Sequence, residues 1–81
     1  MLELKNNTKV VGVKQSLKKM NNKDCRCLCI AKNAEKIVIQ PLIDKAKDLS
    51  VEIVYIDTMT ELGEICDIDV GAAAALFLKE Q

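Results

Sequence analysis

The sequence contains no histidine and no tryptophan, and it has only one tyrosine, one phenylalanine and one proline. Without histidine the chain lacks the commonest general base and a frequent metal ligand. With only Tyr55 and Phe77 it cannot build the aromatic platform on which RRM and OB domains stack bases. We therefore expect a protein that is not an enzyme and that has no catalytic residue, no metal and no cofactor.

Long hydrophobic runs are also missing. The longest run, Val70–Leu78, is much shorter than the roughly 20 residues that a helix needs to cross a bilayer. No apolar segment follows Met1 as it would in a secretory signal peptide. We therefore expect a cytoplasmic protein with no membrane contact. Its 81 residues, 49% hydrophobic and 30% charged, are typical of one small domain at 1–81, with residues 1–7 as a polar tail.

Neither sign of charge is in excess over the whole chain, because 12 basic residues balance 12 acidic ones. The distribution is uneven, however. Residues 1–36 hold nine basic and three acidic residues, a net charge of +6, whereas residues 37–81 hold three basic and nine acidic residues, a net charge of −6. Such asymmetry within one small domain predicts one basic surface, which would suit a nucleic acid. The alternative is a chance distribution of solvated charges.

The four cysteines allow few interpretations. Cys25, Cys27 and Cys29 alternate, so on a strand they share one face at a spacing of about 6.6 Å, too wide for an undistorted disulfide between neighbours. A metal site would need Cys66 as well, and the spacing matches no zinc pattern. We interpret the cysteines as free thiols packed as small apolar side chains. A thiol enzyme or metal protein is the weaker alternative, because the sequence lacks both histidine and a C-x-x-C motif.

The spacing of hydrophobic residues in the first half of the chain predicts two strands and a short helix. Lys9–Gly12 is a β-branched run ended by glycine, which we expect to be an edge strand. Val13, Leu17 and Met20 then recur at the spacing of one helical face. Cys25–Ala31 is apolar on both sides over most of its length, as in a strand that is covered on two faces.

The only proline lies inside the next helical pattern. Proline fits the first turn of a helix and disrupts a helix interior. We therefore predict a helical turn at 34–39 and a separate second helix from Pro41 to about Leu49.

The last part of the chain predicts two strands and one helix. Residues 51–56 are expected to form a second central strand. Thr58 and Glu61 have the spacing of a capping box and should open a helix that runs through Cys66, and residues 72–79 should form the last strand. The alternation of strands and helices predicts an α/β fold, a three-layer α/β/α sandwich with a four-stranded mixed sheet.

The helix after Gly12 has an unusual start. Lys14 lies in the first turn, where the helix dipole disfavours a cation and Asp or Glu is usual. Lys18 lies one turn later on the same face, with Lys19 beside it. This arrangement is understandable if bases and phosphates approach the helix, because helix N-termini bind anions. The alternative is an ordinary solvated face.

Three blocks of sequence resemble one family. Gly12–Lys18 is similar to its G-x-[NK]-[EQ]-x-x-K signature, Ile30–Lys36 to its I-A-x-D-A-x-P block, and Leu62–Ala73 to its L-G-x-x-C-G-I-E-V-x-A-A block. Together and in this order, they identify the chain as a member of the kink-turn RNA-binding ribosomal protein family of the L-seven-Ae and L-thirty-e type. The Lys-Gln form of the first block is similar to that of the small bacterial members.

This resemblance implies the sandwich fold and a monomeric, ribosome-associated protein that recognises the tandem sheared G·A pairs of a kink-turn in ribosomal RNA or a regulatory leader. In the family, the first block enters the kinked major groove and reads guanines, and the last block forms an apolar loop over an extruded base. Lysine is a natural donor to the O6 and N7 atoms of guanine. The expected RNA-binding residues are Gly12, Lys14, Gln15, Lys18, Lys19, Lys32, Ile68, Asp69 and Val70.

Three of the departures from the family pattern bear on the site. Asp67 replaces the usual loop glycine and adds an acid beside Asp69, which we expect to weaken the attraction to phosphate. Asn33 replaces the usual aspartate and Lys36 the usual proline, which we expect to alter only the start of the following helical turn. Asp67 also favours an alternative function, that of a protein-interaction member of the same fold with weak or lost RNA binding.

Overall fold

The computed structural model describes residues 8–79. The predicted polar tail at 1–7 lies outside the described residues, as do residues 80–81. Strands and helices alternate as expected, in the order β1 (Lys9–Val11), α1 (Val13–Lys19), β2 (Cys25–Ala31), α2 (Lys36–Asp48), β3 (Ile53–Ile56), α3 (Met59–Ile65) and β4 (Ala74–Leu78). Within residues 8–79, none of the helices has the length and apolar character needed to cross a membrane.

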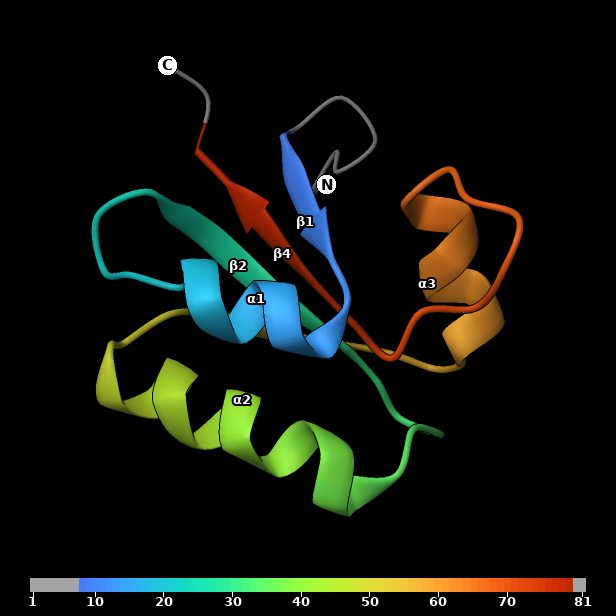
Figure 1. The fold of residues 1–81 in the computed structure, drawn as a ribbon, viewed down its shortest axis with the longest axis horizontal. Helices are drawn as coiled ribbons and strands as arrows, with labels where there is room; N and C mark the ends of the chain where they lie inside the picture. Colours follow the sequence, from blue (N-terminus) through green and yellow to red (C-terminus); the bar gives the residue numbers. More distant parts are fainter. Residues whose placement is uncertain (1–7, 80–81) are drawn as a thin grey trace.

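The four strands form one mixed sheet in the order β1-β4-β2-β3. The last strand in the chain, β4, lies between β1 and β2 and is antiparallel to both, whereas β2 and β3 are parallel (Figure 1). Consequently β1, β2 and β3 all end where β4 begins. We call this side of the sheet the carboxyl edge, defined by the residues that flank the strands there: Gly12, Lys32, Asp57 and Ala73.

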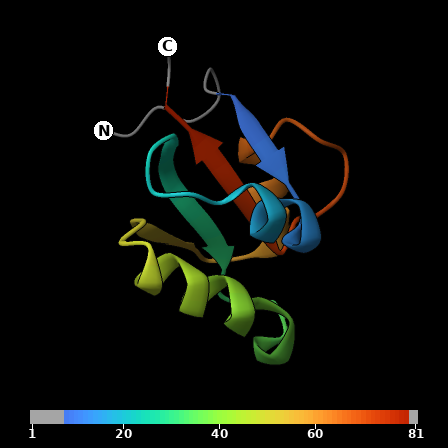
Figure 2. The same cartoon turned by 60° about the vertical axis from the view of Figure 1, so that its left-hand side comes forward.

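The sheet is covered on both faces. Helices α1 and α2 lie on one face, and α3 packs against β2, β3 and β4 from the other (Figures 1 and 2). In β2, Ile30 contacts the α2 side and Cys29 lies near Cys66 at the end of α3, as the alternation of side chains in a strand requires. Residues Cys27–Ala31 are all fully buried. The predicted three-layer α/β/α sandwich is therefore confirmed.

The cysteines are packed as small side chains. All four are free thiols; Cys27, Cys29 and Cys66 are buried, and Cys25 is half-buried. A hydrogen bond with Cys27 and burial both raise the pKa of Cys29, and burial raises the pKa of Cys66. These two thiols therefore stay protonated at neutral pH and are poor nucleophiles. Within residues 8–79, no cluster of three or more His, Cys, Asp or Glu side chains is arranged to hold a metal ion.

The prediction that Pro41 separates two helices is wrong, because α2 is continuous over Lys36–Asp48 with Pro41 inside it. A proline in a helix interior costs about 3 kcal/mol. The turns that follow bury Leu42, Ile43 and Ala46, and full burial of one large aliphatic side chain contributes about 1.5–3 kcal/mol. The packing of this face against the sheet thus outweighs the cost of the proline.

The prediction of a second central strand at 51–56 is also wrong. Strand β3 is shorter, Ile53–Ile56, and lies at the edge of the sheet, where β2 is the one strand within residues 8–79 that pairs with it. The interior position beside β2 is occupied by β4, a pairing between distant segments that local sequence does not reveal. As a result Tyr55 is 50% exposed. The prediction of an edge strand at Lys9–Gly12 is confirmed by β1.

Candidate functional site

The start of α1 is fixed at the carboxyl edge by Gly12. This residue is the N-cap of the helix and has φ 109° and ψ 155°, a conformation that residues with a side chain rarely adopt. Its N–H donates a hydrogen bond to the carbonyl oxygen of Ala74 at 3.0 Å. The chain therefore turns from β1 into α1 directly beside the start of β4.

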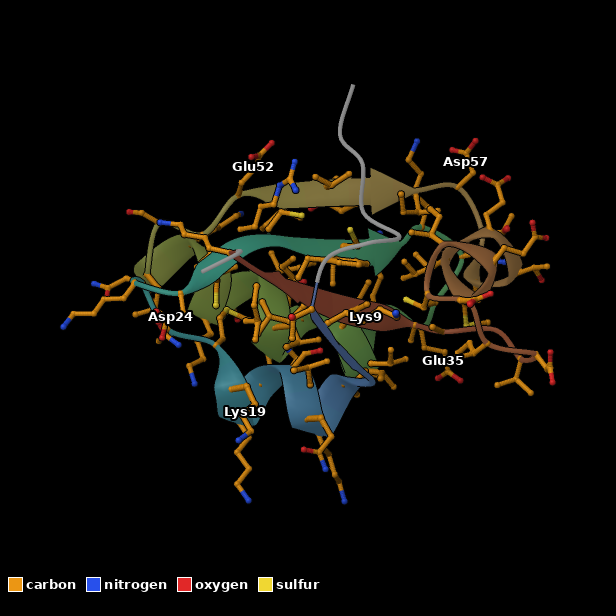
Figure 3. The ribbon with its side chains drawn as sticks, turned by 90° about the horizontal axis from the view of Figure 1, so that it is seen from above. Lys9, Lys19, Asp24, Glu35, Glu52 and Asp57 are labelled. Carbon is orange, nitrogen blue, oxygen red and sulfur yellow. The ribbon has the colours of Figure 1, made fainter. Side chains whose placement is uncertain are left out.

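The polar residues predicted on α1 lie on its outer face. Lys14, Gln15, Lys18 and Lys19 are all exposed, and Lys19 extends away from the sheet in Figure 3. The opposite face is held by Ser16, which is fully buried and donates from Oγ to the carbonyl oxygen of Val10 at 3.3 Å. Among residues 8–79, no side chain caps the N-terminus of α1, and the first turn of this helix contains no acidic residue.

The other end of α1 is held by a lysine that the sequence did not reveal. Nζ of Lys45, in α2, donates to the carbonyl oxygen of Leu17 at 2.6 Å. Lys18 and Lys19 lie in the same last turn, where cations interact favourably with the helix dipole. Lys45 was missed because it is 28 positions from Leu17 in the sequence. The basic region of α1 thus continues onto α2.

The loop after α3 begins with a tight helix cap at Asp67. This residue has φ 63°, in the left-handed region, and its N–H donates to the carbonyl oxygen of Glu64 at 3.0 Å. The N–H of Ile68 donates to the carbonyl oxygen of Gly63, also at 3.0 Å. These two bonds form a Schellman motif, in which glycine is the usual left-handed residue. The position where the family has glycine is therefore one where the backbone favours glycine.

The same loop then folds back over α3. A Cβ atom on Gly63 would lie 2.1 Å from the carbonyl oxygen of Val70, so the loop passes too close to α3 for any side chain at position 63. The N–H of Ala72 donates to the carbonyl oxygen of Met59 at 3.0 Å. Both contacts fix residues 67–73 on the surface of α3. A glycine inside a predicted helix was the sequence signal for this close approach.

The predicted loop residues differ in exposure. Ile68 is half-buried and packs against the core, whereas Asp69 is exposed and Val70 is 70% exposed. Ile68 thus anchors the loop, and Val70 is its most accessible apolar side chain.

The block after β2 links the two sides of the site. Nζ of Lys32 pairs with Asp57 at 3.2 Å, an exposed ion pair of a kind that contributes about 0–1 kcal/mol. Oδ1 of Asn33 accepts a hydrogen bond from the N–H of Met59 at 2.8 Å. The side chain of Asn33 therefore caps the start of α3, a contact that the sequence did not predict. The 26-residue separation of the partners hid this role.

The two helices that flank the carboxyl edge differ in charge. Helix α1 has Lys14, Lys18 and Lys19 and no acidic residue, whereas α3 has Glu61 and Glu64 and no basic residue. In Figure 3, acidic side chains gather around α3 and its loop, with Asp57 at the same end of the molecule. The expected basic surface therefore lies on the α1 side of the edge and does not extend across it.

Comparison with known proteins gives one family. The model of the ribosomal protein L7Ae/L30e/S12e/Gadd45 family matches residues 2–81. RNA-binding protein TTE2299 of Caldanaerobacter subterraneus subsp. tengcongensis is 48% identical over 67 residues, which cover 83% of this chain and 82% of the relative. RNA-binding protein BH0128 of Halalkalibacterium halodurans is 39% identical over 70 residues, 86% of this chain and 85% of the relative.

A solved structure shares the fold. The Giardia lamblia 15.5kD RNA binding protein superposes with a TM-score of 0.76 at 27% sequence identity and covers 90% of this chain. The chain spans 62% of the length of that protein.

Proposed function

The chain belongs to the ribosomal protein L7Ae/L30e/S12e/Gadd45 family, and we propose that it is a non-enzymatic protein that binds kink-turn RNA. Its curated relatives TTE2299 and BH0128 are named RNA-binding proteins. The target that we propose is a kink-turn with tandem sheared G·A pairs, in ribosomal RNA or in a regulatory leader, bound by one copy of the protein in the cytoplasm.

The observation that supports this proposal most strongly is that all three sequence blocks meet at the carboxyl edge. The N–H of Gly12, in the first block, bonds to Ala74, and the N–H of Ala31, in the middle block, donates to the carbonyl oxygen of Ala73 at 3.0 Å. The loop of the last block ends at this same edge, beside the start of α1. An uncapped basic helix and an exposed loop thus border one surface.

The side chains of α1 match the chemistry of a guanine edge. Normal A-form RNA has a major groove too deep and narrow for side chains, so direct readout there requires a distorted target such as a kink. Lys14 and Lys18 are donors for the O6 and N7 atoms of guanine, and the amide of Gln15 both donates and accepts. The exposed Val70 can then pack on a base that the kink has extruded.

Titration of the protein with a kink-turn duplex tests the proposal. We expect 1:1 binding, and much weaker binding to a duplex in which Watson–Crick pairs replace the G·A pairs. Lys18→Ala should reduce this discrimination, because loss of a base contact costs about 1–3 kcal/mol for the correct sequence. Lys23→Ala is the matched control: Lys23 is also exposed but lies before β2, at the opposite edge of the sheet.

A protein contact through α3 is the second candidate function. It is favoured by the exposed acids Glu61, Glu64 and Asp67, which repel phosphate. Absence of binding to the kink-turn duplex even at low salt would contradict the RNA proposal and leave this candidate.

A further inference from the structure

A shallow groove outside the three sequence blocks lies between α2 and the edge strand β3. Its volume is about 270 Å³. Ile30 in β2 and Ile39 and Ile43 in α2 form its apolar part, and Tyr55 stands beside them on β3. Tyr55 is 50% exposed, so part of its side chain is accessible from solvent. The volume lies just below the range of about 300–1,000 Å³ typical of small-molecule sites, which limits the occupant to a group of about the size of one base.

The charged side chains that line the groove are two lysines, and both lie at one end of it. Lys32 and Lys36 line it next to the carboxyl edge, and Lys32 also forms the exposed ion pair with Asp57. Farther along α2, Nε2 of Gln40 donates to Oδ1 of Asp44 at 2.9 Å, which places a carboxylate away from that edge. An anionic group is therefore favoured only at the lysine end, and an uncharged planar group is favoured beside Tyr55.

This groove is continuous with the candidate RNA surface. Lys32 follows β2 at the carboxyl edge, where the three blocks meet, and it also lines the groove. An RNA strand that leaves the carboxyl edge over Lys32 reaches Lys36 and Tyr55 next. The groove thus shares Lys32 with the surface that we propose for the kink-turn.

We infer that the groove between α2 and β3 binds one unpaired nucleotide of the RNA, with its base on the Tyr55 ring and its phosphate at Lys32 and Lys36. This inference rests on the proposed function. The inference gives the exposed Tyr55 ring and the two lysines one common role. It does not require an aromatic platform of the RRM or OB type, because a single ring can stack on a single base. Stacking of this kind tolerates any base, since every base has a π-face. The groove therefore adds affinity without adding sequence preference.

The test compares a kink-turn duplex that has blunt ends with the same duplex that has a short uridine tail at one end or the other. Tyr55 is the only tyrosine and the chain has no tryptophan, so intrinsic fluorescence reports on this ring alone. We expect one of the tailed duplexes to bind at least about fivefold more tightly than the blunt duplex, the lower limit of one base–aromatic stack. We also expect it to quench the tyrosine emission more strongly.

Four variants make the result specific. Tyr55→Phe should keep the gain from the tail, because stacking needs the ring and not the hydroxyl group. Tyr55→Ala should lose the gain and keep its affinity for the blunt duplex. Lys36→Ala should lose part of the gain, whereas Lys47→Ala, in the last turn of α2, should lose none.

The experiment distinguishes failure of the groove inference from failure of the proposed function. If the wild-type protein binds the blunt duplex but no tail improves affinity, the inference is wrong and the proposed function stands; a groove that receives a protein strand along β3 would give this result. Equal gains for wild type and Tyr55→Ala would also overturn the inference. If the blunt duplex is not bound at all, the proposed function fails and this inference fails with it.

Discussion

Helices α1 and α3 have the same length, seven residues each, and flank the same edge of the sheet, yet their N-termini are built in opposite ways. Helix α3 begins at Thr58, whose Oγ1 accepts from the N–H of Glu61 at 3.0 Å, and Oδ1 of Asn33 accepts from the N–H of Met59. Helix α1 begins at Gly12, which has no side chain to offer its first N–H groups.

This difference suggests different roles for the two helices: α3 holds its loop in place, and α1 is free to contact a ligand. The first turn of α3 is satisfied by two side chains of the protein itself, and its body is covered by the loop that passes over Gly63. These contacts make α3 a rigid base for the loop. The first turn of α1 has the exposed Lys14 and, among residues 8–79, no side-chain cap, so its backbone donors are open to a ligand. We interpret α1 as the helix that contacts RNA and α3 as the helix that holds the loop in place.

The largest effect should come from removal of the contact between α3 and its loop. Gly63→Ala places a Cβ atom 2.1 Å from the carbonyl oxygen of Val70, so either the loop or the helix must move. We expect a loss of about 2–3 kcal/mol in the free energy of unfolding, as in other overpacked sites. Urea unfolding measures this loss. RNA affinity should fall with it, because the displaced loop carries Val70.

Gly71→Ala is the control for this substitution. Its Cβ atom would lie 3.2 Å from Cβ of Met59 and 3.3 Å from the carbonyl carbon and oxygen of Met59, so a shift of a few tenths of an ångström is needed, far less than for Gly63→Ala. The interpretation of α3 as a rigid base is contradicted if Gly63→Ala is as stable as wild type or if both variants lose equal stability.

Charge reversal should have the next largest effect, and it should act oppositely on the two helices. Lys18→Glu should weaken kink-turn binding by about 2 kcal/mol, in line with the loss of a base contact. Glu64→Lys should strengthen binding at low salt, and the gain should shrink as added salt screens the charge. Both residues are exposed, so stability should change by no more than about 0.5 kcal/mol in either variant. Titrations at two salt concentrations, with thermal unfolding, check both expectations.

Loss of the Thr58 cap of α3 should lower the stability of the fold without changing RNA affinity. Thr58→Ala removes the acceptor for the N–H of Glu61 and should cost about 1 kcal/mol. RNA affinity should not change, because the capped turn belongs to the support. Thr60→Ala, an exposed position in the same turn, is the matched control and should cost little. A large loss of RNA affinity in Thr58→Ala would show that the start of α3 contacts RNA directly.

The features that the sequence predicts correctly depend on residues that are close together in the sequence. The alternation of elements, the cap at Thr58, and the burial of Cys27 and Cys29 all follow from spacing within a few residues. The basic start of α1 was visible in the same way. These features fix the fold class and one half of the candidate site.

The remaining features depend on contacts between distant segments. The position of β4 between β1 and β2 made β3 an edge strand, and packing against the sheet kept α2 continuous through Pro41. Lys45 on Leu17 and Asn33 on Met59 join residues 28 and 26 positions apart. Propensity and periodicity describe one segment at a time, so they contain no information on such partners.

We expect the smallest effect at Asp67, which caps α3 and also lies in the loop that we propose to contact RNA. Its φ of 63° costs a residue with a side chain more than it costs glycine, although aspartate tolerates this region better than most residues. Its carboxylate lies in the same loop as Asp69 and Val70, so it would repel the phosphates of an RNA that contacts Val70, and salt would screen this repulsion. Asp67→Gly should therefore raise the free energy of unfolding slightly, by no more than about 1 kcal/mol, because glycine suits a left-handed cap but loses more conformational entropy on folding.

The same substitution should also strengthen RNA binding, for a separate reason. Removal of the carboxylate reduces repulsion of the phosphates, and this part of the gain should fade at high salt, whereas the change in stability should not depend on RNA. Asp67→Asn separates the two effects, because asparagine removes the charge and keeps a side chain in the left-handed conformation. It should reproduce most of the gain in affinity at low salt and less of the gain in stability. Weaker RNA binding by Asp67→Gly than by wild type would mean that the carboxylate orders the loop for recognition, and α3 would then not be a support alone.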